Sequence, residues 1–238
     1  MILNLIFHKI YKYQTEIKDK YDITYDYYLI IIKEVNNLIK SKKSKFTDYR
    51  IYFDDGYDSF KNIVFPNMTI LQKHKTTLAI VTDLIGKNGY LDKKSLECFN
   101  KCGITISSHT ASHTALAVYK NNKLQNSIKG GIYQNSPSGQ GDILTENEIL
   151  YQFIESKNKL KNCGFKVNEL VLPHGLYNDT VIRINYEYGI YAYISTCDEY
   201  LDEGQSLKPR FLIDNERSIA DTITSIIDLN NINIFKLK

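Results

Sequence analysis

Short apolar runs alternate along the chain with segments in which apolar residues recur every three or four positions. The runs have the length and continuity of strands buried on both faces, and they lie at residues 2–7, 50–53, 77–81, 104–107, 169–172, 190–194 and 210–213. The periodic segments are typical of helices that bury one face, and they lie at residues 26–40, 66–74, 92–102, 145–163, 179–188 and 218–229. This alternation predicts an α/β fold, a parallel sheet wrapped by helices that is either open or closed into a barrel.

Local signals mark several of the predicted boundaries. Thr145 and Glu148 form a capping-box pattern where a helix should begin, and Gly103 follows a helix at a position where glycine is common. The stretch 117–144 is polar and rich in glycine. It is too long for a simple connection, so we interpret it as an inserted functional loop or lid. Since no linker or internal repeat interrupts the pattern, we expect one domain over residues 1–238.

Three clusters of polar residues directly follow predicted strands. They are Asp54 with Asp55, His109 with His113, and Pro173-His174-Gly175. In parallel α/β folds the carboxyl ends of the strands lie at one edge of the sheet, where binding and catalytic residues gather. We therefore expect the three clusters to form one site.

The two histidines of the second cluster have metal-ligand spacing. His109 and His113 lie four residues apart, so in a helix or a tight turn both imidazoles project from one face. A carboxylate from Asp54 or Asp55 would complete a ligand set of the type that catalytic zinc uses. Adjacent aspartates repel each other unless a cation compensates. A metal ion on one and proton transfer by the other would explain the pair, whereas either motif alone is also common in ordinary surface turns.

Three motifs, in this order, resemble those of the polysaccharide deacetylase family (NodB homology, carbohydrate esterase family four). They are Phe53-Asp54-Asp55-Gly56-Tyr57, Ser108-His109-Thr110-Ala111-Ser112-His113 and Leu172-Pro173-His174-Gly175. The opening stretch Leu5-Ile6-Phe7-His8-Lys9-Ile10 is similar to the first strand of the branch that deacetylates poly-N-acetylglucosamine. The resemblance covers most of the chain, from the first strand to Arg210.

The resemblance implies a distorted (β/α)7 barrel that hydrolyses an N-acetyl or other N-acyl group on an amino sugar. By the family pattern Asp54 is the catalytic base. Asp55, His109 and His113 would hold one divalent ion, zinc first, with cobalt, nickel or iron as alternatives. Metal-bound water, whose pKa falls to about 7, would attack the amide carbonyl, and the base would take its proton.

One residue of the first motif and two of the third are expected to contact the substrate. These residues are Tyr57, Pro173 and Gly175. Backbone N–H groups near Tyr57 or His174 are candidates for stabilising the tetrahedral oxyanion, as fixed donors do in other acyl transfers.

The chain departs from the family pattern at two places. The family carries an arginine two residues before the proline of the third motif, where it holds the catalytic aspartate, and here that position is Val171. Arg210 resembles a late arginine of the poly-N-acetylglucosamine branch, so we expect it to take over this role. The late Leu-x-His motif, which supplies a general acid in many members, is missing. His174 and then His8 are the candidates for protonating the leaving amine.

Composition and charge narrow the function classes. Lys and Arg number 30 against 27 Asp and Glu, a net charge of +3 that gives no argument for nucleic acid, so no nucleic-acid partner is expected. No apolar run approaches the roughly 20 residues of a membrane span, so no transmembrane segment is expected. The N-terminus lacks the features of a secretory signal, which predicts a cytoplasmic protein. The four cysteines have no paired spacing and are expected to be reduced and mostly buried.

Three functions fit these features. The first is a metal-dependent carbohydrate deacetylase acting on an N-acylated amino sugar that is part of an oligosaccharide or is lipid-linked or nucleotide-linked. The second is a catalytically impaired glycan-binding module derived from a deacetylase, a reading motivated by the two departures. The third, a non-haem iron oxygenase, uses the same ligand types but is mostly built on antiparallel sheets. In the inserted loop, the residues able to stack on or hydrogen-bond a sugar are Tyr133, Asn121, Asn135 and Gln140.

Overall fold

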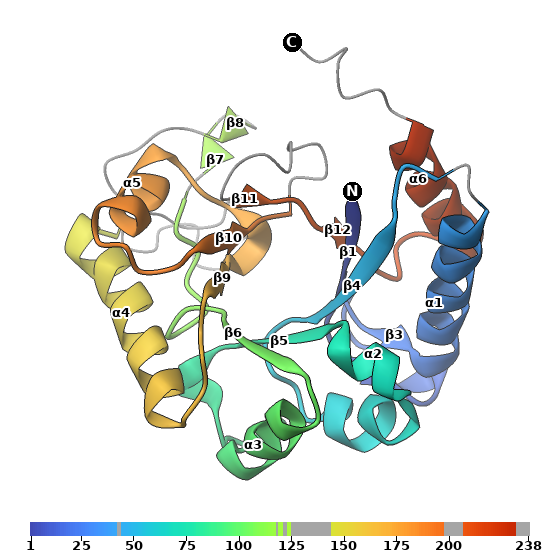
Figure 1. Cartoon of the computed structure of the whole chain (residues 1–238), viewed down its shortest axis with the longest axis horizontal. Coiled ribbons are helices and arrows are strands. Elements are labelled where there is room, and N and C mark those ends of the chain that lie inside the picture. The colour runs from blue at the N-terminus through green and yellow to red at the C-terminus, as the bar shows by residue number, and fades with distance from the viewer. Residues whose placement is uncertain (42–43, 118, 121–122, 125–143, 198–206, 232–238) are drawn as a thin grey trace.

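The computed structural model describes residues 1–41, 44–117, 119–120, 123–124, 144–197 and 207–231. Within them an all-parallel sheet curls around a central axis (Figure 1), in the strand order β11-β10-β9-β6-β5-β4-β1-β12. Its strands are β1 (Ile2–Phe7), β4 (Asp48–Phe53), β5 (Thr76–Ile80), β6 (Thr105–Ser108), β9 (Glu169–Val171), β10 (Tyr193–Ser195), β11 (Leu207–Lys208) and β12 (Phe211–Leu212).

The two edge strands of this sheet are consecutive in the chain. β11 pairs with β10 through Leu207, β12 pairs with β1 through Phe211, and only Pro209 and Arg210 lie between them. Because proline has no N–H to donate, it interrupts the ladder at this point. If β11 and β12 are counted as one interrupted strand, the sheet has seven strands, and this strand joins its two sides. The expected distorted (β/α)7 architecture is confirmed.

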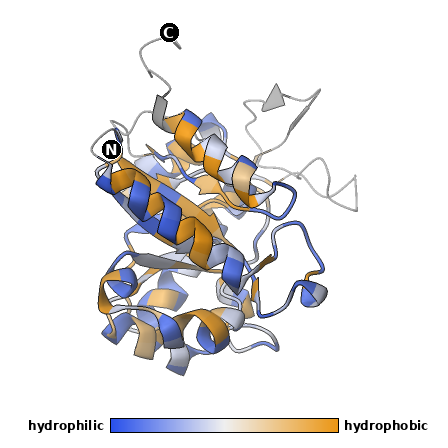
Figure 2. Ribbon diagram, turned by 90° about the vertical axis from the view of Figure 1, so that its right-hand side faces the viewer, coloured by the Kyte–Doolittle hydropathy of each residue, from blue (hydrophilic) through white to orange (hydrophobic). Residues whose placement is uncertain are grey.

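Helices cover the outside of the sheet. They are α1 (Tyr25–Lys40), α2 (Ile70–His74), α3 (Lys93–Lys101), α4 (Glu146–Asn162), α5 (Asp179–Glu187) and α6 (Ile219–Asn231). Single turns and short strands complete the described chain: η1 (Gln14–Glu16), η2 (Phe60–Val64), η3 (Phe65–Asn67), η4 (Thr82–Leu84), η5 (Pro173–Gly175), β2 (Ile10–Tyr11), β3 (Ile23–Thr24), β7 (Tyr119–Lys120) and β8 (Lys123–Leu124). In Figure 2 the helices carry hydrophobic residues along one side and hydrophilic residues along the other. No helix in the described part of the chain is both long and apolar enough to cross a bilayer.

Most predicted elements are present, and two differ. The helix predicted at 66–74 is divided into η3 and α2, because Thr69 starts a new helix by accepting a hydrogen bond from the Gln72 N–H. The strand predicted at 190–194 begins only at residue 193. The side chain of Asn185 binds both the N–H and the carbonyl of Tyr191, which holds the preceding residues in a turn.

The thiols are free, but the expectation that they are mostly buried is wrong: Cys98 is exposed and the other three are partly exposed. Most of the proposed loop 117–144 lies outside the described residues. So do its suggested sugar contacts, which are Asn121, Tyr133, Asn135 and Gln140.

Candidate metal centre

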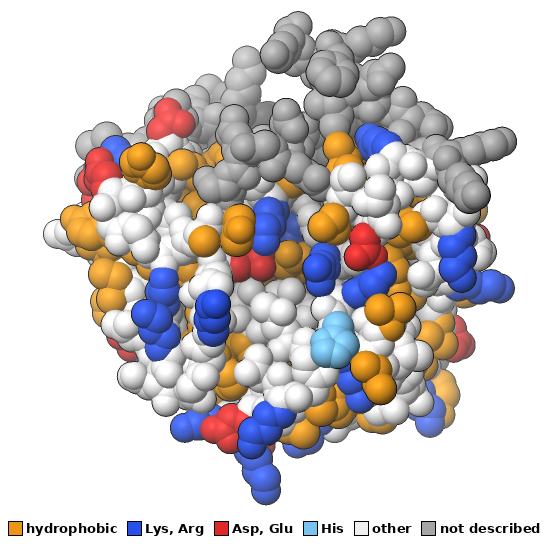
Figure 3. Space-filling model, in the orientation of Figure 1, with side chains coloured by type: hydrophobic (Ala, Val, Ile, Leu, Met, Phe, Trp, Pro, Cys, Tyr) orange, Lys and Arg blue, Asp and Glu red, His pale blue; other side chains and the backbone are white. Residues whose placement is uncertain are grey.

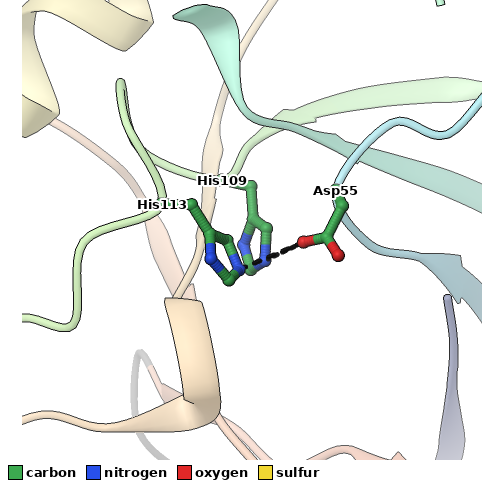
Figure 4. A group of neighbouring side chains, drawn as sticks. All are labelled: Asp55, His109 and His113. Carbon is green, nitrogen blue, oxygen red and sulfur yellow. Dashed lines mark ion pairs between the residues drawn. The ribbon is translucent and has the colours of Figure 1, made fainter. Parts of the chain in front are cut away.

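Three of the predicted ligands converge at the carboxyl ends of β4 and β6 (Figure 4). One ligand atom from each of Asp55, His109 and His113 lies within 4.8 Å of the others. Asp55 Oδ1 is 3.3 Å from His109 Nε2 and 3.1 Å from His113 Nε2. Both imidazoles therefore face the same carboxylate oxygen, as the four-residue spacing predicted.

Unusual backbone conformations bring these side chains together. Among the described residues, the non-glycine residues with positive φ are Asp55 (71°), Thr110 (65°), His113 (62°) and His174 (57°). Residues other than glycine rarely adopt a positive φ, and where they do the position often belongs to a functional site. The Thr110 hydroxyl accepts a hydrogen bond from the His113 N–H at 3.1 Å. The two histidine ligands are thus joined by a tight turn rather than by a helix.

The arrangement fits a divalent cation. His109 Nδ1 lies 2.8 Å from the Val171 carbonyl, so its proton belongs on Nδ1 and the lone pair of Nε2 points at Asp55. Asp55 Oδ1 is buried and accepts no hydrogen bond of ordinary geometry from the described residues. A buried carboxylate oxygen without a partner is costly. A cation between this oxygen and the two Nε2 atoms would satisfy all three groups, and the ligand types suit zinc or another first-row divalent metal.

The neighbouring aspartate is held by an arginine instead. Asp54 is 3% exposed, and Nη1 of Arg210 donates to its two oxygens at 2.9 and 3.1 Å. Although burial opposes ionisation, the Arg210 guanidinium and then His109 lower the pKa of Asp54. Burial likewise opposes ionisation of Asp55, but the close approach of the His109 and His113 imidazoles holds its pKa well below the usual range. Both aspartates are therefore ionised at neutral pH.

Arg210 reaches the site from the junction between β11 and β12. It is 1% exposed, and its Nε donates to the Thr196 carbonyl at 3.3 Å. Val171, the position at which the family resemblance leads one to expect arginine, lies on β9 and packs with Tyr52 and Ala79 in the interior of the sheet. Arg210 thus contacts Asp54 from the β11–β12 junction, whereas Val171 belongs to β9.

The two candidate general acids are neutral at pH 7. The His174 ring is 4.9 Å from the His113 ring. Burial and the neighbouring His113 and His109 imidazoles lower the pKa of His174 to about 4. Burial also lowers the pKa of His8, although Asp55 and Asp54 act in the opposite direction. His8 packs against Tyr21, with 5.0 Å between ring centroids.

The three expected substrate contacts differ in what they offer. Pro173 has no N–H, and the Gly175 N–H donates to the Leu172 carbonyl at 3.0 Å, so neither offers a free backbone donor. Gly175 has φ 67°, and a Cβ there would lie 2.5 Å from Cys197 atoms, so packing requires glycine. The Tyr57 ring stacks on that of Tyr90 at 5.1 Å. Of the three, Tyr57 is the one that leaves a backbone N–H to consider for the oxyanion.

Sequence reasoning missed two residues that support the site. Gln152 on α4 accepts hydrogen bonds from the N–H groups of Ala111 and Ser112, each at 3.1 Å, and thereby holds the turn between the histidine ligands. Tyr90 packs on Tyr57 from the loop before α3. A glutamine within the apolar face of the helix predicted from residue 145 was the available signal for the first. No local pattern identified the second.

Comparisons with known proteins agree with this geometry. The family model described as polysaccharide deacetylase matches residues 41–193. No curated protein matches the sequence. Similar solved structures include a de-N-acetylase from Aggregatibacter actinomycetemcomitans (TM-score 0.68, 17% identity, 94% of this chain and 98% of that one). Others are the Streptococcus pyogenes deacetylase PplD in complex with acetate (0.65, 19%, 94% and 96%) and IcaB from Ammonifex degensii (0.66, 12%, 97% and 97%). At these identities the structures support the fold alone.

Proposed function

The chain belongs to the polysaccharide deacetylase family and is a carbohydrate deacetylase, and we propose that it removes an N-acetyl or other N-acyl group from an amino sugar with one divalent metal ion, zinc in the first place. One observation carries the proposal. The ligand atoms of Asp55, His109 and His113 converge within 4.8 Å, and an ionised Asp54 lies beside them, its Oδ2 3.9 Å from His109 Nε2. In this position Asp54 could act as a base beside the metal ligands without being one of them.

The roles of the residues follow from their contacts. Asp55, His109 and His113 would hold the metal ion, which when bound supplies Lewis-acid chemistry by acidifying water and polarising the acyl carbonyl. Asp54 accepts the proton of the attacking water. Arg210, whose Nη1 binds both oxygens of Asp54, fixes the direction of the carboxylate and keeps it charged.

Metal-dependent release of acylate tests this function. The purified protein would be reconstituted with zinc, cobalt, nickel or iron and offered N-acetylglucosamine oligosaccharides and lipid-linked and nucleotide-linked N-acyl sugars. We expect acetate or formate from at least one substrate class, and none after the metal is chelated. One bound metal ion per chain, with no release from any substrate, would instead support the glycan-binding alternative. Part of the reason for that alternative is already removed, because Arg210 pairs with Asp54 where Val171 cannot.

We further propose that His174 protonates the leaving amine, with His8 as the second candidate. Because its pKa is lowered to about 4, His174 starts neutral and must first receive the proton that Asp54 takes from water. We expect His174→Asn to lower kcat by about 10²-fold, the low end of general-acid effects, with metal content unchanged. The matched control is His74→Asn, which replaces an exposed histidine on α2. A wild-type kcat in His174→Asn would exclude this role.

A further inference from the structure

A line of buried polar side chains continues from Arg210 into the barrel. The Arg210 Cζ lies 5.0 Å from the centre of the Tyr52 ring, and the Tyr52 hydroxyl donates to Glu169 Oε1 at 3.0 Å. These residues come from the β11–β12 junction, β4 and β9. Tyr52 is 3% exposed and Glu169 is 7% exposed. Neither is a metal ligand, and the proposed mechanism gives neither of them a role.

Glu169 is firmly held at the far end of this line. The Ser195 hydroxyl donates to Oε1, the Ser107 hydroxyl donates to Oε2 at 3.4 Å, and Lys208 Nζ lies 3.6 Å from Oε1. These groups meet the requirement that a buried carboxylate be paired and hydrogen-bonded. Glu169 also lines a cavity of about 440 Å³ together with Arg50, Lys208 and other residues. Figure 3 shows such a hollow, with acidic side chains among lysines and arginines.

Arg210 needs support on the face of its guanidinium group. It reaches Asp54 through Nη1 alone, and its Nη2 is buried without a hydrogen bond to the described residues. Its Nε bond to Thr196 is long, at 3.3 Å. The Tyr52 ring is the flat surface beneath the group, and cation–π attraction is strongest where water is excluded. Donation of the Tyr52 hydroxyl to a carboxylate fixes the ring and polarises it toward the cation.

We propose that Tyr52 and Glu169 are positioning residues for Arg210 and, through it, for the base Asp54. The effect on turnover rests on the proposed function, whereas the contact between Tyr52 and Arg210 does not. In this arrangement the tether that the family places at residue 171 is replaced by three residues from different strands. Val171 and Ala79 share the interior layer with Tyr52, and their small side chains leave space for its ring.

Graded substitutions test the proposal. Tyr52→Leu removes the ring and the hydroxyl, Tyr52→Phe removes only the hydroxyl, and Glu169→Gln keeps the shape of the acid. We expect kcat to fall by about tenfold in the first and about threefold in the other two, the loss of part or all of one desolvated cation–π contact. KM and metal content should stay unchanged. Tyr27→Phe, which removes a buried hydroxyl bonded to Thr222 on the outer helices, should leave kcat unchanged.

A second readout does not depend on turnover. The Arg210 Nε–H signal in a nitrogen NMR spectrum, assigned by its loss in Arg210→Lys, should exchange with water about tenfold faster in Tyr52→Leu and at the wild-type rate in Tyr27→Phe. Exchange at the wild-type rate in Tyr52→Leu would overturn the positioning role. So would a tenfold loss of kcat when Tyr52→Leu is added to Arg210→Lys, because the effect would then not pass through Arg210. If Tyr52→Leu does not fold, Tyr52→Phe and Glu169→Gln decide on the same readouts. Faster exchange in a protein that releases no acylate would overturn the proposed function but not the contact.

Discussion

Asp54→Asn is expected to lower kcat by about 10³-fold, within the range for loss of a positioned general base, while the metal content stays at the wild-type level. Asparagine keeps the shape of the side chain but cannot accept the proton from water. Asp54 is not one of the three residues whose ligand atoms converge on the metal site, so its replacement should not remove the metal ion. Initial rates of acylate release and metal analysis of the purified variant measure the two effects separately.

The same substitution is expected to destabilise the fold. Arg210 is fully buried, and among the described residues Asp54 is its one partner of opposite charge within 4 Å. Removing one member of a buried ion pair costs about 3–5 kcal/mol, because the other charge is left unpaired. Denaturant unfolding should therefore give a lower free energy for Asp54→Asn. Combining it with Arg210→Met should restore part of this loss, since both charges are then absent.

Asp214→Asn is the matched control, because this buried aspartate accepts hydrogen bonds from the N–H groups of Glu216 and Arg217 and lies outside the site. It should keep the wild-type kcat. Asp54→Asn that turns over at the wild-type rate would remove the base from the mechanism, whatever its stability.

His113→Ala is expected to lower kcat by about 10³-fold and to abolish retention of one metal ion per chain during dialysis. The loss corresponds to about 4 kcal/mol of transition-state stabilisation, the order of magnitude that a catalytic metal supplies. His113 suits this test better than His109, because its side chain is 30% exposed against 2%. His109 also binds the Val171 carbonyl, so its removal would disturb packing as well as metal binding.

Thermal unfolding supplies a readout of metal binding that needs no substrate. A metal present at about 1,000 times its dissociation constant stabilises the folded state by about 4 kcal/mol, so zinc should raise the Tm of the wild type but not that of His113→Ala. His74→Ala, at the exposed end of α2, should respond to zinc like the wild type. A zinc-dependent Tm of unchanged size in His113→Ala would contradict the ligand assignment.

Much of the fold was predictable because its signals are local. The runs that become β1, β4, β5, β6 and β9 are almost entirely buried, and their apolar residues marked them as strands. The two-residue strand β12 lies within the run predicted at 210–213, whereas β11 was not predicted. Their pairing on opposite sides depends on the curl of the whole sheet rather than on their own residues.

The sequence by itself determined which groups stand at the ends of the strands. The order strand, Asp54-Asp55-Gly56 and strand, His109-x-x-x-His113 places acids and imidazoles at one edge of any parallel sheet. The family resemblance pointed to Arg210 as the partner of Asp54, but only the tertiary structure brings the two together, since they lie 156 residues apart. The tertiary structure also decided that Tyr52 and Glu169 lie beneath that arginine. The physical reason is that neighbours along a strand are set by covalent spacing, whereas contacts across the interior exist only once the sheet has curled around it.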